Sequence, residues 1–334
     1  MRITVALFVA LALLAVSPPG VPAGTPDVLL TDQASRRVLL LDGTRRDWDP
    51  AAEPGVVRWA FSPLGDARYA DLQPERSWVH PNEAKVRGYR GRTYVLTSAS
   101  YGFAAVVAYP SGERYWAGAL APGTIRVNPH SVELLPNGDV AVAGSTGDVV
   151  RLYAAGSGGR ERGREPGPER GREPAGAAFA AYALDDAHGL QWDDRWRVLW
   201  ALGRDRLVAL KAGRERGLPA LTRVFEVALP TPGGHDLGQV AGDPDRLWVS
   251  SGSAVYQYVK SAGRFVRDFA GAARISRARV KAVGDDPVTG QVLSTVPESG
   301  LAEPWWTRTV AVHRPSGTYR LVNGGIYKAR WWLP

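Results

Sequence analysis

The stretch at residues 128–143 reads NPHSVELLPNGDVAVA, and its pattern decides the fold. A histidine precedes a short apolar run, Pro136-Asn137-Gly138 supplies a turn, and a second apolar run follows. Short runs of this kind bounded by Gly, Asn and Pro are typical of paired β-strands. The same plan returns in DAHGLQWDDRWRVLWALG at residues 186–203 and in GGHDLGQVAGDPDRLWVSSG at residues 233–252. The sequence therefore predicts a repeated β-unit.

Six segments of the chain align on this plan. Their first residues are 46 or 47 positions apart, except for one interval of 58 between His130 and His188. The segments begin at Glu83, His130, His188, His235, Lys281 and Lys328. A period of about 40–50 residues fits one four-stranded propeller blade. We predict an all-β, six-bladed β-propeller over residues 24–334.

The two ends of the chain complement each other. The last unit stops after one strand, YKARWW at residues 327–332, and the missing strands stand near the beginning, at residues 27–32 and 36–42. We expect N- and C-terminal strands to pair in one blade, because this removes two free sheet edges. The long interval contains residues 154–178, rich in Gly, Arg, Glu and Pro, which we expect to form a disordered insertion within a blade.

The N-terminal residues have the pattern of a secretion signal. Met1-Arg2 is followed by an apolar run to Val16 and by the small-residue pattern Val21-Pro22-Ala23. We expect residues 1–23 to be a cleaved signal peptide and the mature protein to be secreted, with no membrane span. The sequence has no cysteine, which excludes disulfides, thiolate catalysis and Cys-ligated zinc.

The net charge of +8 suggests an anionic partner. The arginines are scattered among carboxylates and form no basic stripe, which argues against nucleic acid and leaves acidic glycans as partners. Motifs of serine hydrolases, P-loop proteins and HExxH metalloproteases are absent. We expect a monomer.

The first residues of the six units predict a ring around the propeller axis. Three of them are histidines, and imidazoles from neighbouring blades can converge on one divalent metal, with Glu83 as an oxygen ligand. Zinc, manganese and iron all suit such a site. In the alternative interpretation, His130, His188 and His235 only cap the starts of strands by bonding nearby backbone.

Two lysines complete the predicted ring. Lys281 and Lys328 would repel a cation, so we expect them to hold an acidic ligand or, like His80 nearby, to accept a proton in catalysis. Alternatively, each lysine pairs with a neighbouring carboxylate, for which Asp285, Asp286 and Glu83 are the candidates.

Loops on the same face as the ring carry further candidates. The connections that should meet there contain Arg204 and the aromatic residues Tyr101, Trp305 and Trp306, together with Tyr69, Trp78 and His80 in a long inter-blade connection. Exposed aromatic rings beside a polar site suit sugar binding, although tryptophan in propellers also packs between blades.

The chain resembles a family of secreted bacterial six-bladed propellers known as a domain of unknown function. The motifs are LLTDQASRRVLLLD, NPHSVELLPNGDVAVAGS, AHGLQWD followed by LWALG, and GGHDL followed by LWVSSG. It is more loosely similar to oligogalacturonate lyases, propellers whose channel metal is held by three histidines and a glutamine. That resemblance implies a metal at His130, His188 and His235, but Glu83 stands where the glutamine would be.

Two functions are consistent with these patterns. One is an extracellular protein that binds a metal or an acidic, sugar-like ligand in its channel, including a metal-dependent polysaccharide lyase. The other is a non-enzymatic scaffold that binds carbohydrate or protein.

Overall fold

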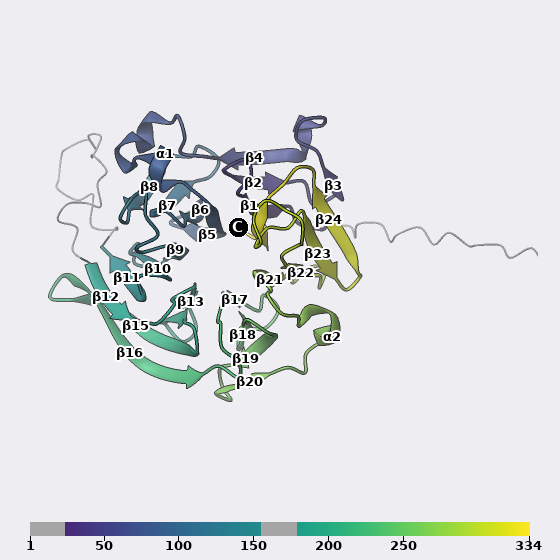
Figure 1. The fold of residues 1–334 in the computed structure, drawn as a ribbon. Helices are drawn as coiled ribbons and strands as arrows, with labels where there is room; N and C mark the ends of the chain where they lie inside the picture. Colours follow the sequence, from purple (N-terminus) through teal and green to yellow (C-terminus); the bar gives the residue numbers. More distant parts are fainter. Residues whose placement is uncertain (1–23, 155–178) are drawn as a thin grey trace, which may run out of the picture.

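A computed structural model describes residues 24–154 and 179–334. Six sheets surround one axis, and the C-terminal strand lies near it (Figure 1). The predicted six-bladed β-propeller is thus confirmed. The predicted signal peptide and nearly all of the predicted insertion lie outside the described residues. None of the helices in the described ranges has the length and apolar composition needed to cross a bilayer.

The first sheet confirms the predicted closure of the ring. From the axis outward it contains β25 (Ile326–Trp331), β1 (Val28–Asp32), β2 (Arg37–Leu41) and β4 (Val57–Phe61). The C-terminal strand pairs antiparallel with β1, and Val28 lies opposite Trp331. In addition, β3 (Asp47–Trp48) pairs in parallel with the outer strand of the sixth sheet. The N-terminal segment therefore joins two blades.

The remaining sheets each follow the chain from the axis outward. The second has β5 (Pro81–Tyr89), β6 (Arg92–Ala99), β7 (Phe103–Ala108) and β8 (Arg114–Ala119). The third has β9 (Pro129–Leu134), β10 (Val140–Gly144), β11 (Val149–Tyr153) and β12 (Phe179–Ala183). The fourth has β13 (Gly189–Asp193), β14 (Val198–Leu202), β15 (Arg206–Glu215) and β16 (Leu218–Ala228).

The fifth sheet has β17 (Asp236–Gln239), β18 (Arg246–Ser250), β19 (Val255–Val259) and β20 (Arg264–Val266). The sixth has β21 (Ala282–Asp285), β22 (Val292–Thr295), β23 (Thr309–His313) and β24 (Gly317–Leu321), with β3 outside it. Short helical turns occupy connections only: η1 (Pro54–Val56), η2 (Ala67–Leu72), α1 (Pro74–Ser77) and α2 (Ala272–Ile275).

The core is divided into layers between neighbouring blades. Each cluster of buried apolar side chains joins adjacent sheets, as where Trp48 stacks on Tyr319 with ring centroids 4.8 Å apart. Tyr69 and Trp78 belong to such a layer and are fully buried, so their expected position on the open face was wrong. Aromatic burial of this kind stabilises the inter-blade contacts.

Candidate functional site

The innermost strands all begin at one end of the ring, which we call the histidine end. Just before each of five strands, one residue has left-handed backbone geometry with φ between 49° and 80°. These residues are His80, Asn128, Asp186, Gly233 and Arg279. Asn, Asp and Gly adopt this geometry most readily, which explains the repeated pattern of Asn, Asp or Gly two positions before histidine. The turn therefore places the residue two positions later at the mouth of the ring.

Matching β-bulges in two blades show that Asn82, and not Glu83, is the equivalent of His130. In β9, Pro129 pairs with Gly144 and Ser131 with Ala143, so His130 is the extra residue. The same irregularity in β5 lies between Pro81 and Glu83, and makes Asn82 the equivalent of His130. A one-residue shift changes the direction of the side chain.

The last strand has a comparable irregularity. In β25, Ile326 pairs with Asp32 and Ala329 with Leu30, so Tyr327 takes the ring position and Lys328 the next one. The ring at the histidine end therefore consists of Asn82, His130, His188, His235, Lys281 and Tyr327. The alignment of Glu83 and Lys328 with the histidines was wrong, because the bulges place both one step further along the axis.

The three histidines do come together, and we call them the imidazole group. The ring centroids of His130 and His188 are 4.4 Å apart, those of His188 and His235 are 4.6 Å apart, and those of the outer pair are 6.4 Å apart. Tyr327 lies against the outer pair, and its hydroxyl is 2.9 Å from Nε2 of His235. Histidines from three consecutive blades thus form one contiguous polar surface.

Hydrogen bonds to the backbone determine which ring nitrogen carries a hydrogen in two of the three imidazoles. Nδ1 of His130 lies 3.1 Å from the carbonyl of Asn128, and Nδ1 of His188 lies 3.0 Å from the carbonyl of Asp186. Since a carbonyl can only accept, Nδ1 carries the proton in both rings. This is the strand-capping bond expected in the alternative interpretation, but it also directs both Nε2 atoms away from the backbone.

Burial keeps two of the imidazoles uncharged. Loss of hydration lowers the pKa of His130 well below its ordinary value, and the adjacent His188 lowers it further. Burial and the ammonium group of Lys281 do the same for the pKa of His235. Burial raises the pKa of Tyr327, so its hydroxyl keeps its proton and can donate to His235. At neutral pH, the unprotonated nitrogens of His130 and His235 are hydrogen-bond acceptors.

Lys281 stands beside the imidazole group without a carboxylate partner. Its ammonium nitrogen lies 5.6 Å from the centroid of the Tyr327 ring, and no side chain in the described ranges forms an ion pair or hydrogen bond with it. Burial lowers the pKa of Lys281 to about 8, the neighbouring cations Lys328 and Arg279 contribute, and the more distant carboxylate of Asp186 acts in the opposite direction. The alternative prediction that Lys281 pairs with Asp285 or Asp286 was wrong, because Asp285 binds Trp248 and Asp286 binds Thr289.

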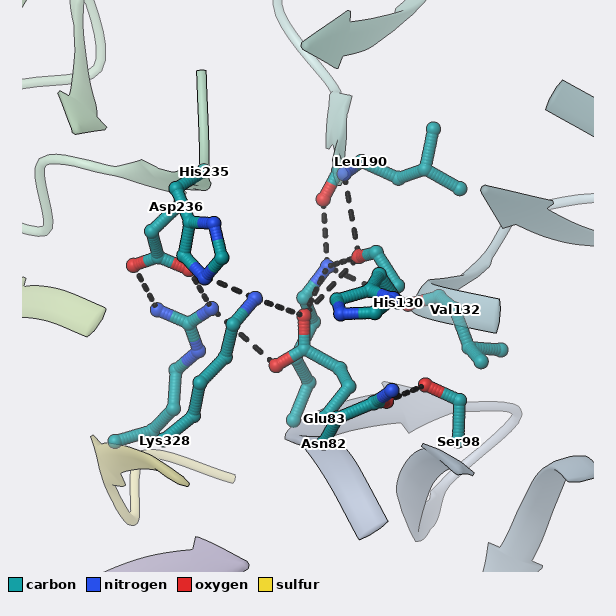
Figure 2. A network of polar contacts seen from close by, with 12 residues as sticks. Asn82, Glu83, Ser98, His130, Val132, Leu190, His235, Asp236 and Lys328 are labelled. Carbon is teal, nitrogen blue, oxygen red and sulfur yellow. Dashed lines mark hydrogen bonds and ion pairs between the residues drawn. The ribbon is translucent and has the colours of Figure 1, made fainter. Parts of the chain in front are cut away.

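A buried ionic layer lies directly below the imidazole group. Lys328 Nζ is 3.5 Å from Glu83 and 3.3 Å from Asp236, and Arg330 reaches both carboxylates (Figure 2). Lys85 Nζ, also buried, lies 3.6 Å from Glu83. Burial alone would raise the pKa of Glu83, but the three cations lower it to about 2. The predicted pairing of Lys328 with Glu83 is confirmed, and both side chains belong to a buried network of ion pairs.

The predicted ligands, the imidazole group and Glu83, are not arranged to hold a metal ion. Within the described residues, no group of three or more His, Asp or Glu side chains is arranged to hold one. Glu83 is engaged by Lys328 and Arg330, and the ammonium of Lys281 faces the same space as the imidazoles. Both features oppose a divalent cation, since its charge would be repelled.

Arg204 is connected to the imidazole group through Asp186. Its Nη2 lies 4.0 Å from Oδ2 of Asp186, whose Oδ1 is 3.0 Å from Nδ1 of His188. Its main partner is the exposed carboxylate of Asp185, at 2.7 Å from Nε. The sequence analysis missed Asp186, Tyr327 and Asp236, although Asp186 and Asp236 stand within two residues of the histidines that they adjoin.

The predicted aromatic residues lie at the same end of the ring but form a separate group. His80 contacts the rings of Tyr101 and Trp305 and not the imidazole group, with centroids 5.8 Å and 5.6 Å away. Trp306 packs against the backbone of Gly325, where a Cβ atom would lie 2.6 Å from the indole. Trp200 and Trp248 are buried between blades.

One family model matches part of the chain. Residues 176–334 match the model described as Family of unknown function (DUF6528). This is the predicted resemblance to a domain of unknown function. The matched residues include two of the four quoted motifs, those containing His188 and His235. No curated protein matches the chain.

Solved structures share the propeller fold at low sequence identity. A protein of unknown function from Bacteroides caccae has a TM-score of 0.51 and 11% identity, covering 92% of this chain and 98% of that one. Virginiamycin B lyase from Staphylococcus aureus has a TM-score of 0.44 and 10% identity, covering 72% and 84% respectively. At this identity, the likeness concerns the fold.

Proposed function

We propose that this protein binds a hydroxylated carboxylic acid, such as a sugar acid, at the histidine end of its channel. The carboxylate of the ligand pairs with Lys281, and a hydroxyl group of the ligand donates to Nε2 of His130. Secretion, predicted from residues 1–23, would make the ligand an extracellular one.

The state of Lys281 is the observation that supports this proposal most. A half-buried ammonium without a directly bonded counter-ion is costly, because it has lost hydration and the nearest carboxylate, Asp186, is bonded to His188 instead. The adjacent ionic layer does not supply that partner, since Glu83 and Asp236 are held by Lys328 and Arg330. An anionic ligand would remove the cost.

The imidazole group adds selectivity for hydroxyl groups. His130, which burial keeps neutral and whose Nδ1 is bonded to the backbone, presents its Nε2 as an acceptor and not as a donor. A bare carboxylate has no hydrogen to give it, whereas a sugar acid has several. The site is thus suited to a ligand with one charge and neighbouring hydroxyls.

Calorimetric titration with D-galacturonate tests the proposal, with uncharged D-galactose as the matched ligand. The native protein should bind galacturonate and not galactose, and Lys281→Met should lose at least tenfold in affinity. Lys211→Met, which removes an exposed lysine of β15, should leave the affinity unchanged. Equal binding of both sugars, or unchanged affinity after Lys281→Met, would refute it.

The metal ion and the lyase reaction predicted from the sequence remain predictions. Elemental analysis and a chelator added to the same titration check the metal, which the proposed binding does not require. Release of unsaturated uronate products, followed by absorbance, checks the reaction. Of the three predicted proton acceptors, only Lys281 adjoins the imidazole group without an ion-pair partner among the described residues.

A further inference from the structure

A second polar and aromatic group lies at the histidine end, between the second and sixth sheets. His80 precedes β5, Tyr101 lies in the β6–β7 turn, and Glu303 and Trp305 belong to the connection between β22 and β23. We call these four residues the aromatic cluster. Both aromatic rings are half-buried and contact the imidazole of His80 at interplanar angles of 79° and 74°.

The indole of Trp305 is held in place through its polar edge. Its Nε1 donates to Oε1 of Gln33 at 2.9 Å, and Nε2 of Gln33 donates to the carbonyl of Pro81 at 3.1 Å. Trp306 donates to the same Gln33 oxygen at 2.6 Å while its ring packs on Gly325. Trp305 is therefore oriented before any ligand arrives, which lowers the entropic cost of stacking.

Glu303 gives the aromatic cluster a hydrogen-bond acceptor. Its carboxylate lies 3.7 Å from Nε2 of His80 and is about one-third exposed. Burial lowers the pKa of His80, so the imidazole leaves the charge of Glu303 largely uncompensated at neutral pH. An aromatic face beside a free carboxylate suits a neutral sugar ring, whose C–H face stacks while its hydroxyls donate.

Backbone contacts tie the aromatic cluster to both sides of the proposed carboxylate site. Arg279, two residues before Lys281, donates to the carbonyl of Pro304 at 2.7 Å. On the other side, Asn82, two residues after His80, donates to the carbonyl of Pro129 at 2.7 Å, next to His130. The two groups therefore belong to one continuous rim.

We propose that the aromatic cluster is a second subsite, at which Trp305 and Tyr101 stack on the sugar next to the acidic one. This inference rests on the proposed function and makes its substrate class more specific: an oligosaccharide in which a neutral sugar is linked to an acidic one. A free monosaccharide acid would occupy only the site at Lys281.

Titration with D-galacturonate and with a disaccharide of galacturonate and the neutral sugar rhamnose tests the second subsite. The native protein should bind the disaccharide about tenfold more tightly than the monosaccharide. Trp305→Ala should lower disaccharide affinity to the monosaccharide level and leave monosaccharide affinity unchanged, while Trp305→Phe should retain part of the gain. Trp196→Ala is the matched control, because this exposed indole lies in the β13–β14 turn at the opposite end of the ring.

The possible failures are distinguishable. Equal native affinity for monosaccharide and disaccharide would overturn the second subsite while leaving the proposed function intact. So would a Trp305→Ala variant that weakens both ligands alike while its melting temperature stays native. Absence of binding by either ligand would overturn both proposals.

Discussion

At Lys281, the protein keeps an ammonium group partly out of water and gives it no partner among the described residues. Lys328, one blade away, is more deeply buried yet lies between two carboxylates. Lys328 is therefore part of the buried ion-pair network, whereas Lys281 faces the proposed binding site. Sequence alone could not separate them, because both occupy similar positions in the repeat and the bulge that distinguishes them has no residue signature in β25.

Lys281→Met should stabilise the free protein at neutral pH. The pKa of Lys281 is lowered to about 8 from its ordinary 10.5, so the unfolded chain binds the proton more strongly. The resulting cost is fully present below pH 8 and disappears as the pH rises towards 10.5. Denaturant unfolding at pH 7 should show a gain on the order of 1–3 kcal/mol for Lys281→Met, and no change for Lys211→Met. A loss of stability would mean that Lys281 has a partner in the folded protein.

The turn before each innermost strand is the element that builds the site. Left-handed geometry at Asn128, Asp186 and Gly233 precedes the three histidines, and their Asn, Asp and Gly identities made this alignment visible in the sequence. In both His80-Pro81-Asn82 and Asn128-Pro129-His130, a left-handed residue is followed by proline. Aligning the two prolines would therefore have identified Asn82 as the ring residue from the sequence. The ring position of Tyr327 could not have been identified in this way, because Gly325, two residues earlier, does not have positive φ. The bulge in β25 depends instead on the pairing of this strand with β1.

Asn128→Val should test this turn directly. A β-branched residue is strained at φ 50°, so the free energy of unfolding should fall by roughly 1–3 kcal/mol. In Asn128→Gly the free energy of unfolding should fall by less, because glycine adopts the same geometry freely. Thermal or denaturant unfolding of the two variants gives the comparison, and a valine variant as stable as the glycine variant would show that the turn is not constrained.

At the scale of the whole molecule, the C-terminal strand both closes the ring and supplies the site. β25 pairs with β1 and carries Tyr327, Lys328 and Arg330 into the axis. The repeat period and the incomplete last unit were enough to predict the number of blades and this closure from the sequence. The buried ionic layer could not be predicted, because its residues come from three blades and meet only after the ring has closed.

Deletion of residues 326–334 should therefore prevent folding. It exposes the edge of β1 and leaves Glu83 and Asp236 buried without Lys328 and Arg330, a loss that costs several kcal/mol. Circular dichroism and solubility should show an unfolded or aggregated chain. Removal of Leu333 and Pro334 alone, which lie beyond β25, should be tolerated. A soluble, cooperatively folding product of the longer deletion would contradict the role assigned to closure.

The pH dependence of galacturonate affinity tests the central claim most directly. If the ammonium of Lys281 holds the ligand carboxylate, native affinity should be constant from pH 6 to 7 and decline as the pH rises past about 8. Lys281→Arg, which stays charged, should bind with little change in affinity up to pH 9.5. A native affinity that does not decline with pH, or a Lys281→Arg variant that declines in parallel with it, would contradict the account.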